Sequence, residues 1–480
     1  MKDAFRHHVV VWSVTGAVVL AVVAVLLYRQ WLYGSPHFGY SIGRTPDERL
    51  PVQEPRPGVD LTTTTADDFP EFLGPGRHVA VDRIELDPDW TAHPPRLVWR
   101  HPLGAGWSGF VAVNGFAVTM EQRGEQEQVT CYAVASGQHH WTAGWNERFS
   151  INGAGPRSTP TIAGGRVYAL GAWGHLVCLN GQTGEVVWQR ELLQELGIHS
   201  SDENRHVRFG RANSPLVIGK LVIVPGGGMP GKRSSLLAFD AATGQPRWRG
   251  GDRQISYSSP VLAELLGETQ VLSVNEDTVS GHSLDTGAEI WSYPWPGDSS
   301  VDANVSQPVP LTGNRILLSA GYRRGAAVIE LTRRTAGEPT QVRCVWRVAS
   351  VLNTKFTNVA VWKNHAYGLS DGLLECVALE AGARLWKAGH YGDGQILRVN
   401  DMLLVLGEGG ELVLVRLDPQ TPNAVQGRMQ GLTGRTWNNL ALYGRYLLVR
   451  NATEAACYEL ATLPAVRNEP PSAKRVAREP

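Results

Sequence analysis

Five cysteines are the side chains of this sequence best suited to nucleophilic or redox chemistry: Cys131, Cys178, Cys344, Cys376 and Cys457. No two of them form a CxxC pair, so the spacing typical of zinc sites and of thioredoxin-like redox sites is absent. Their odd number also argues against a framework of disulfides. Cys131, Cys178 and Cys376 each lie six residues before a turn glycine, a place that small residues fill elsewhere in the chain. Cys457 holds a similar place in the last unit, and we therefore interpret these four thiols as buried structural residues.

Two further motifs resemble reactive sites. The stretch GGGMPGK at 226–232 nearly fits a phosphate-binding P-loop, but Arg233 stands where Ser or Thr would hold magnesium. It falls between two expected strands with no helix after it, so we predict a hairpin loop. The pair His139–His140 lacks the third ligand that a metal site needs, and its place beside a turn predicts exposed side chains. These motifs identify neither a catalytic residue nor a metal site.

The composition describes a folded protein rich in turns. Lys and Arg number 45 and so do Asp and Glu, and this balance argues against a nucleic-acid partner. Hydrophobic residues make up 42%, enough for a sizeable core, which excludes a disordered or collagen-like chain. The 53 glycines and 16 tryptophans stand out, because tryptophan outnumbers both Tyr and Phe. Many turns and many indoles predict repeated short strands.

The chain between the two ends is a repeat. A turn followed by tryptophan recurs at Trp141, Trp188, Trp248, Trp291 and Trp386. The sequences of these five turns are ASGQHHW, QTGEVVW, ATGQPRW, DTGAEIW and EAGARLW. Together with tryptophans 99 and 346, the steps are 42, 47, 60, 43, 55 and 40 residues. This is the size of one four-stranded propeller blade with loop insertions.

The strands of each repeat can be assigned from alternating apolar runs and turns. In 159–188, for example, TPTIA, RVYAL, HLVCLN and EVVW are separated by turn residues, which predicts an antiparallel sheet. A seventh unit, from Ile396 to Gln420, has lost its tryptophan, and the final unit stops after three strands. The segment RLVW around Trp99 is the spare strand that could close the ring. We predict an all-β, eight-bladed β-propeller, with seven blades left open as an alternative by the irregular stretch 248–346.

Two motifs of this sequence are similar to those of a known family. The TGxxxW turn resembles the repeat of pyrroloquinoline-quinone (PQQ)-like propellers, and FPEFLGPGR, Phe69 to Arg77, is similar to the opening motif of bacterial PQQ-like repeat proteins. The resemblance covers roughly Phe69 to Leu460. Relatives include quinoprotein alcohol and glucose dehydrogenases and a noncatalytic scaffold, the B subunit of the outer-membrane β-barrel assembly machinery. The repeat is specific for the fold and poorly specific for activity.

The resemblance also implies what an active member would carry. Quinoprotein alcohol dehydrogenases have adjacent cysteines over the cofactor, a calcium held by Glu and Asn, and an Asp base. This chain has no adjacent cysteines and no motif that matches the calcium or base residues. Glucose-type quinoproteins lack the cysteine pair, so its absence alone does not exclude catalysis. We predict no cofactor, no metal and no catalytic residue, with PQQ and calcium as the cofactors of the alternative.

Polar side chains mark the places where the expected inner strands begin. These strands line the channel of a propeller, and they start GPRSTP, GRANSP, SYSSP, NVSQP, KFTNV and TWNNL. The candidate ligand-binding residues at the channel mouth are Arg157, Arg211, Asn213, Ser258, Gln307, Lys355, Asn358 and Asn438. Such groups can hold an anion by charge-assisted hydrogen bonds. The favoured alternative is that they satisfy backbone groups of crowded strands.

The first thirty residues predict a membrane anchor. Residues 9–28 are twenty consecutive uncharged residues, about 30 Å of helix, which is the hydrocarbon thickness of a bilayer. Lys2 and Arg6 precede them, which favours a single pass with the N-terminus inside. A cleaved signal peptide is the rival, but its apolar run is usually shorter. The expected order is anchor 1–33, linker 34–68, propeller 69–463 and disordered tail 464–480.

We expect from this sequence a noncatalytic binding or scaffold propeller on the outer side of the cytoplasmic membrane, in the periplasm or exterior. Its partners would be proteins of the bacterial envelope, bound by loops at one face of the ring. One alternative is a PQQ- and calcium-dependent oxidoreductase acting on alcohols or sugars. The other is a sensor of a small anionic ligand at the channel mouth.

Overall fold

The computed structural model describes residues 56–151, 153–297, 303–335 and 337–463 of the chain. The predicted membrane helix at 9–28, most of the predicted linker and the predicted tail at 464–480 lie outside these residues. Within the described ranges, no helix combines the length and the apolar character needed to cross a bilayer.

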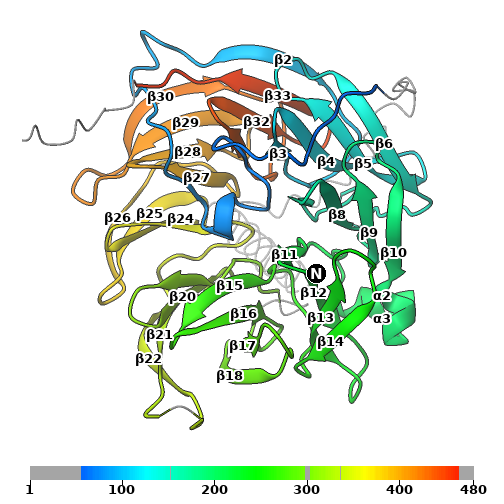
Figure 1. The fold of residues 1–480 in the computed structure, drawn as a ribbon. Coiled ribbons are helices and arrows are strands. Elements are labelled where there is room, and N and C mark those ends of the chain that lie inside the picture. Colours follow the sequence, from blue (N-terminus) through cyan, green and yellow to red (C-terminus); the bar gives the residue numbers. More distant parts are fainter. Residues whose placement is uncertain (1–55, 152, 298–302, 336, 464–480) are drawn as a thin grey trace, which may run out of the picture. The chain divides into compact units, whose positions relative to one another are not determined.

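The described strands form eight sheets arranged around a central axis (Figure 1). Each sheet has four antiparallel strands, and one carries a fifth, parallel strand at its inner edge. The protein is therefore an all-β, eight-bladed propeller, as predicted, and the alternative of seven blades is wrong. The stretch 248–346 contains blade 4 and all of blade 5 except its last two residues.

The blades follow one another along the chain. Blades 1 to 4 are β3–β6 (Val111–Val113, Phe116–Arg123, Gln126–Ala133, His139–Trp145), β7–β10 (Thr161–Ala163, Arg166–Leu170, His175–Asn180, Val186–Glu191), β11–β14 (Leu216–Ile218, Leu221–Gly227, Ser234–Asp240, Pro246–Gly250) and β15–β18 (Val261–Leu265, Glu268–Val274, Thr278–Ser283, Glu289–Pro294). Blades 5 to 7 are β19–β22 (Val309–Leu311, Arg315–Ala320, Gly325–Thr332, Gln341–Val348), β23–β26 (Val359–Trp362, His365–Ser370, Leu373–Ala378, Ala383–Ala388) and β27–β30 (Gln395–Val399, Met402–Leu406, Glu411–Arg416, Ala424–Gln430). Two short helices, α2 (Leu192–Leu196) and α3 (Ser200–His206), lie between blades 2 and 3.

Blade 8 is built from both ends of the propeller sequence. β31 (Ala441–Tyr443), β32 (Tyr446–Arg450) and β33 (Glu454–Glu459) supply three strands, and β2 (Arg96–Pro102) pairs antiparallel with β33. The predicted closure by the segment around tryptophan 99 is confirmed. It leaves neither β2 nor β33 as an unpaired end of the ring.

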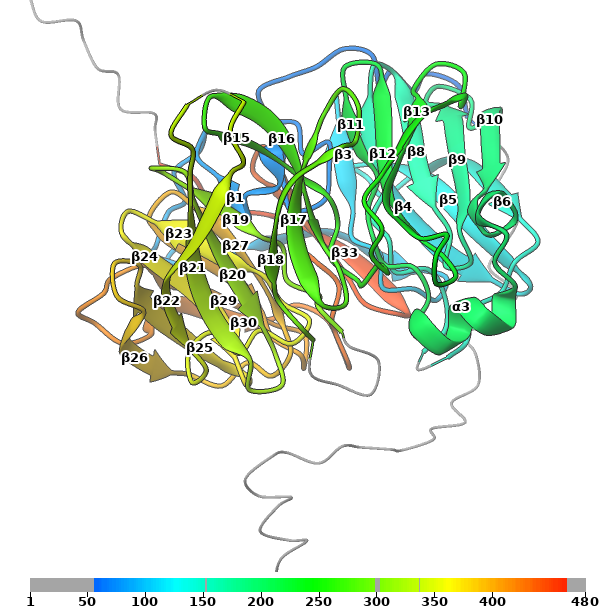
Figure 2. The ribbon, with the colours of Figure 1, turned by 90° about the horizontal axis from the view of Figure 1, so that it is seen from below.

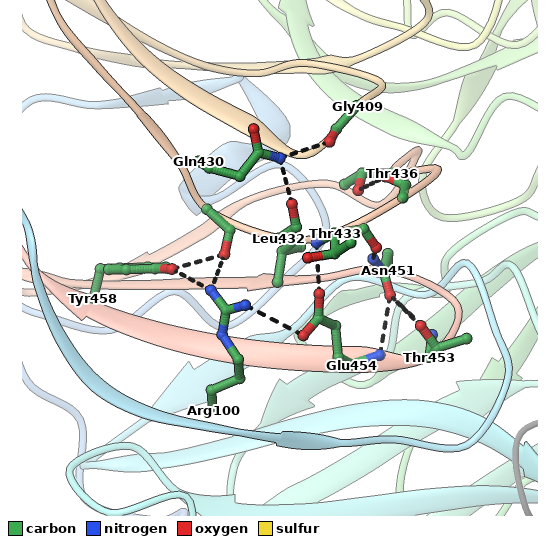
Figure 3. Close-up of polar contacts among 12 residues, drawn as sticks. Arg100, Gly409, Gln430, Leu432, Thr433, Thr436, Asn451, Thr453, Glu454 and Tyr458 are labelled. Carbon is green, nitrogen blue, oxygen red and sulfur yellow. Dashed lines mark hydrogen bonds and ion pairs between the residues drawn. The ribbon is translucent and has the colours of Figure 1, made fainter.

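Side chains reinforce this closure on the side of blade 7 (Figure 3). Arg100 of β2 donates to the carbonyl of Gly431 and, at 2.8 Å, to the hydroxyl of Tyr458. The carboxylate of Glu454 accepts the backbone N–H of Thr433 at 2.6 Å. The closing strands are therefore bound to the loop that arrives from blade 7 as well as to each other.

The repeat tryptophans join neighbouring blades. The indole of Trp141 in blade 1 donates to the carbonyl of Gly181 in blade 2 at 2.9 Å and lies against the turn glycine Gly184. The same bond to the next blade is made by tryptophans 99, 188, 248, 346 and 386. Trp291 differs, because its indole donates within its own blade to Gln270 at 2.8 Å. The TGxxxW turn thus encodes a contact between blades.

Blade 7 has replaced its lost tryptophan from elsewhere in the chain. Trp90, which is 5% exposed, packs on the backbone of Gly427 in the outer strand β30. A Cβ at Gly427 would overlap Trp90, so only glycine leaves room for the indole. The segment before β2 therefore completes the packing of this blade.

The segment before blade 1 also crosses the ring. We call residues 56–81 the N-terminal strap; it includes the turn η1 (Pro75–Arg77) and the strand β1 (Ala80–Val81). Phe69 bridges to Ala112 in blade 1, and β1 pairs in parallel with β27 in blade 7. In Figure 1 the strap is the blue segment that passes over the inner ends of the blades.

The strap includes the described end of the predicted linker. Val59 and Leu61 are both 2% exposed and pack into the core of blades 1 and 2. Residues 56–68 thus belong to the packed domain. They also cover blade 1: the N–H of Arg56 donates to the carbonyl of His140 at 2.7 Å. The predicted exposure of the histidine pair is wrong, because His139 and His140 are only 7% and 9% exposed.

Arg77 holds the strap at the channel. Its side chain is 1% exposed and pairs with Glu71 at 3.0 Å. It donates to the carbonyl of Ser214 in the segment before blade 3 at 3.1 Å, to that of Pro260 before blade 4 at 2.9 Å, and to that of Pro215. One buried guanidinium thus connects the strap to the inner edges of two blades.

The two ends of the ring differ as a result. We call the end that carries the turns between first and second strands, such as Asn114–Gly115, the turn face. The strap binds here: Asn114 donates its N–H to Asp68 at 3.0 Å, and Gly444 donates to Asp67 at 3.1 Å. The opposite end, the loop face, carries the loops that enter the inner strands and also α3. Figure 2 shows strap and α3 at opposite ends.

Candidate functional site

The mouth of the channel on the loop face is built from equivalent positions of the eight blades. The residues at or just before the start of each inner strand form two layers around the channel, which are polar except for two glycines. The layer next to the strands consists of Gly109, Thr159, Ser214, Ser259, Gln307, Asn358, Gln395 and Asn439. The layer before it consists of Ser108, Ser158, Asn213, Ser258, Ser306, Thr357, Gly394 and Asn438.

Hydrogen bonds run from blade to blade within the first of these layers. The N–H of Thr159 donates to the hydroxyl of Ser214 at 3.0 Å, and the N–H of Ser214 to that of Ser259 at 2.8 Å. The N–H of Gln307 donates to the amide oxygen of Asn358 at 2.9 Å. A side chain of one blade thus satisfies a buried backbone donor of the blade before it.

The second layer uses its amides in the same way. Asn213 donates both amide hydrogens to blade 4, to the carbonyls of Ser256 at 3.1 Å and Ser258 at 2.7 Å. Asn438 donates across the closing seam to the carbonyl of Ser108 at 2.8 Å. These side chains are at most 2% exposed. The predicted mouth residues Asn213, Asn358 and Asn438 therefore connect neighbouring blades. This agrees with the alternative given in the sequence analysis, in which they satisfy backbone groups of crowded strands.

Arg157 is folded into its own loop. Its guanidinium donates to the carbonyls of Ile151 at 2.8 Å and Gly155 at 2.9 Å, and it lies 4.7 Å from the centre of the Phe149 ring. Burial lowers the pKa of Arg157 to about 10. The residue is at the loop face where it was predicted, with its hydrogen bonds directed to the protein.

Arg211 lies deeper than predicted. It is fully buried, pairs with Glu203 of α3 at 2.8 Å, and donates to the carbonyls of Pro225 and Gly226 in β12 at 2.9 Å each. Each guanidinium nitrogen thus has a protein partner. The arginine attaches the inserted helix to blade 3.

Lys355 is the most accessible charged group among the predicted residues, with its side chain 40% exposed. Its ammonium group lies 3.0 Å from the carboxylate of Asp393 and 4.8 Å from the centre of the Phe356 ring. Burial raises the pKa of Asp393, and the neighbouring lysine opposes this rise. Ligand binding by the eight predicted residues stays a prediction.

Aromatic side chains at the mouth were missed by the sequence analysis. Trp437 lies 4.9 Å from Trp107 and 5.2 Å from Phe356, measured between ring centres, and Arg435 stacks on it at 4.9 Å. Trp107, Phe356 and Trp437 each stand one position ahead of the second polar layer, directly before Ser108, Thr357 and Asn438. Aligning the repeats on the inner strands rather than on the outer tryptophans would have found them.

Four of the five thiols lie in the cores of the blades. Cys131, Cys178, Cys376 and Cys457 are buried directly opposite repeat tryptophans, and Cys344 is exposed. Burial raises the pKa of Cys178 and Cys376 to about 11 and that of Cys457 to about 12. The thiolate is the reactive form, so these groups are inert at neutral pH.

This burial predicts the outcome of thiol labelling. The native chain should react with a water-soluble disulfide reagent at pH 8 at one thiol per molecule, and the unfolded chain at five. Cys344→Ser should abolish the native reaction and leave four thiols in the unfolded chain. Rapid labelling of two or more thiols in the native protein would contradict the structural interpretation.

Calcium coordination requires several oxygen ligands, commonly carboxylates. Among the described residues, no three His, Cys, Asp or Glu side chains gather into a group that could hold a metal ion. The absence of PQQ remains a prediction.

The sequence matches a known family. The family model described as outer membrane protein assembly factor BamB matches residues 96–202 and 125–388. The BamB protein of Shewanella oneidensis is 25% identical over 144 residues, which is 28% of this chain and 32% of that protein. The aligned part thus spans about a third of the length of this relative.

Solved structures share the fold. BamB from Moraxella catarrhalis superposes with a TM-score of 0.54 and 16% identity, over 76% of this chain and 99% of the other. A quinohemoprotein alcohol dehydrogenase from Comamonas testosteroni gives 0.57 and 13%, over 82% and 80%. At these identities the likeness shows the fold alone. The family model, however, covers more than half of the sequence, and the chain therefore belongs to the PQQ-like β-propeller family described as outer membrane protein assembly factor BamB.

Proposed function

We propose that this protein is a noncatalytic scaffold that binds other proteins of the bacterial envelope through its loop face. The match of residues 96–388 to the family described as an assembly factor carries the proposal. We further propose that residues 9–28 hold the propeller at the outer side of the cytoplasmic membrane. The twenty uncharged residues of that segment support this location.

The choice of the loop face rests on the strap. Strap residues bind the turns of blades 1 and 8, so part of the turn face is already used by the chain itself. The loop face carries the longest insertion, with α2 and α3, and half-exposed aromatic residues at the mouth. Loops on a rigid scaffold are the usual place for binding residues.

Crosslinking from each face tests this proposal. A photoreactive amino acid at Arg205, an exposed residue of α3, should form adducts with envelope proteins in the membranes of the native host. The same amino acid at Thr183, an exposed turn residue on the turn face, should form few. Adducts at Thr183 alone would place the partners on the turn face and contradict our choice of the loop face. Adducts at neither position would contradict the proposal that the protein is a scaffold.

The alternative enzyme has its own test. Adding PQQ and calcium to the purified chain should leave no quinone absorbance on the protein after desalting, and no dye reduction with alcohols or sugars. Stoichiometric retention of PQQ with turnover would replace the scaffold by a quinoprotein oxidoreductase.

A further inference from the structure

A buried carboxyl group lies in the seam between blades 1 and 2 at the loop face. Glu127, at the start of β5, has no exposed surface. Its Oε2 accepts the N–H of Ala172 in blade 2 at 3.1 Å. Its Oε1 is buried without a hydrogen-bond partner among the described residues. An ionised carboxylate in this position would leave charge on an oxygen that has no hydrogen-bond donor among the described residues.

Further titratable groups continue from Glu127 along the same seam. Glu147 accepts the indole N–H of Trp145 at 3.1 Å, and Trp145 stacks on His175 of blade 2 at 4.7 Å. His175 in turn lies 2.6 Å from the carboxylate of Glu191. We call these five residues, Glu127, Trp145, Glu147, His175 and Glu191, the seam latch.

The charges around the latch favour protonated carboxyls. The negative charge of Glu147 disfavours ionisation of Glu127, and that of Glu191 disfavours ionisation of Glu147. The positive charge of Arg157 opposes this effect and favours ionisation of Glu127. Tyr257, which lies near Arg157, in turn favours the charged form of the arginine by raising its pKa. Burial is the largest cause in both carboxyls and raises the pKa of Glu127 to about 8 and that of Glu147 to about 7.

We propose that the seam latch is a proton-dependent contact between blades 1 and 2: closed while Glu127 and Glu147 carry protons, and loosened when they ionise. Two of its carboxyls belong to blade 1 and one to blade 2. Ionisation therefore places like charges on both sides of the seam. The turn 171–174, which holds Ala172 and precedes His175, is the part of blade 2 that should move away.

The direction of the pH effect follows from proton binding. Unfolding exposes the two carboxyls and returns their pKa values to about 4.5. Between pH 4.5 and 8 the folded chain then binds more protons than the unfolded chain, so stability falls as the pH rises. The contribution of the latch is complete below pH 4.5 and lost above pH 8.

Glu127→Gln tests the latch in the full chain, because glutamine keeps the shape of the neutral acid. Hydrogen exchange of the segment 170–176 should be measured at pH 5.5 and 8.5 and divided by the intrinsic exchange rate. In the wild type, protection should fall by about tenfold or more between the two values. In Glu127→Gln it should fall much less. Glu185→Gln, an exposed turn residue, should behave as the wild type.

The unfolding equilibrium supplies a second measurement. Wild type and Glu127→Gln should differ little in denaturant midpoint at pH 5.5, and the variant should be the more stable at pH 8.5. Glu147→Gln should show the same trend over a lower pH range, and serves if Glu127→Gln fails to fold. Parallel pH dependence of protection in the wild type and both variants would overturn the proposal.

Discussion

Replacing Arg77 by methionine should destabilise the propeller by about 3–5 kcal/mol, because the substitution removes one partner from a buried charged network. Methionine retains the length of the stem but removes the guanidinium donor from three backbone carbonyls and from Oε2 of Glu71. Denaturant unfolding of the full chain, followed by circular dichroism, measures the loss. Limited proteolysis should cut the variant within the strap before the blades unfold.

The matched control is Arg96→Met. Arg96 also pairs with a glutamate, Glu459, but its side chain is 66% exposed. Exposed ion pairs contribute about 1 kcal/mol or less. Equal losses for the two variants would show that Arg77 acts as a surface charge and that the strap does not depend on it.

Replacing Trp99 by alanine should lower the free energy of unfolding by about 3–5 kcal/mol, which is the range for truncating a buried tryptophan. Trp99 is 8% exposed, packs on the turn glycine Gly137 and donates to the carbonyl of Val134 at 2.7 Å. It lies in the seam between blades 8 and 1, next to the strand that closes the ring. The free energy of unfolding and the rate of proteolysis within 93–103 should both report the change.

Trp173→Ala provides the comparison. Its indole also donates to a carbonyl, that of Arg148 at 3.1 Å, but from a partly exposed position outside the strands. Its loss of stability should be less than about half that of Trp99→Ala, without faster cleavage at 93–103. If cleavage there is unchanged in Trp99→Ala as well, the indole does not secure the closing strand.

The repeat made most of the fold predictable. A blade is a local unit, so the turn, the tryptophan and the strand lengths recur within about forty residues and can be found by comparing the chain with itself. Closure by the segment around Trp99 was predictable for a different reason: a final unit with three strands leaves an edge that one spare strand elsewhere can cover.

Contacts between distant segments were not predictable. The motif that ends at Arg77 was recognised, but its acceptors lie 137, 138 and 183 residues away, and no spacing in the sequence relates them. The hydrogen bond between the backbones of Arg56 and His140 likewise joins residues that no spacing in the sequence relates. Trp90 takes the place of a repeat tryptophan from outside the repeat, so self-comparison cannot find it.

The polar residues at the channel mouth could be predicted in position but not in the direction of their side chains. Repeat positions correctly located Asn213 and Asn438, but whether a side chain faces the channel or the next blade depends on how the blades pack. Arg211 shares that segment and is drawn away by Glu203, a residue of the insertion between blades 2 and 3 that has no counterpart in the other blades. Composition at a position is therefore weaker evidence for a ligand site than the partners of each side chain.

Closure of blade 8 also sets when the protein can finish folding. Arg96 and Glu459 face each other across 363 residues. At about 5–20 residues per second, roughly 20–70 seconds separate the synthesis of these two partners. Until β33 has been made, β2 has no partner and the growing chain exposes two strand edges that can pair with other chains. A newly made molecule thus remains open to aggregation through these edges until β33 has been synthesised.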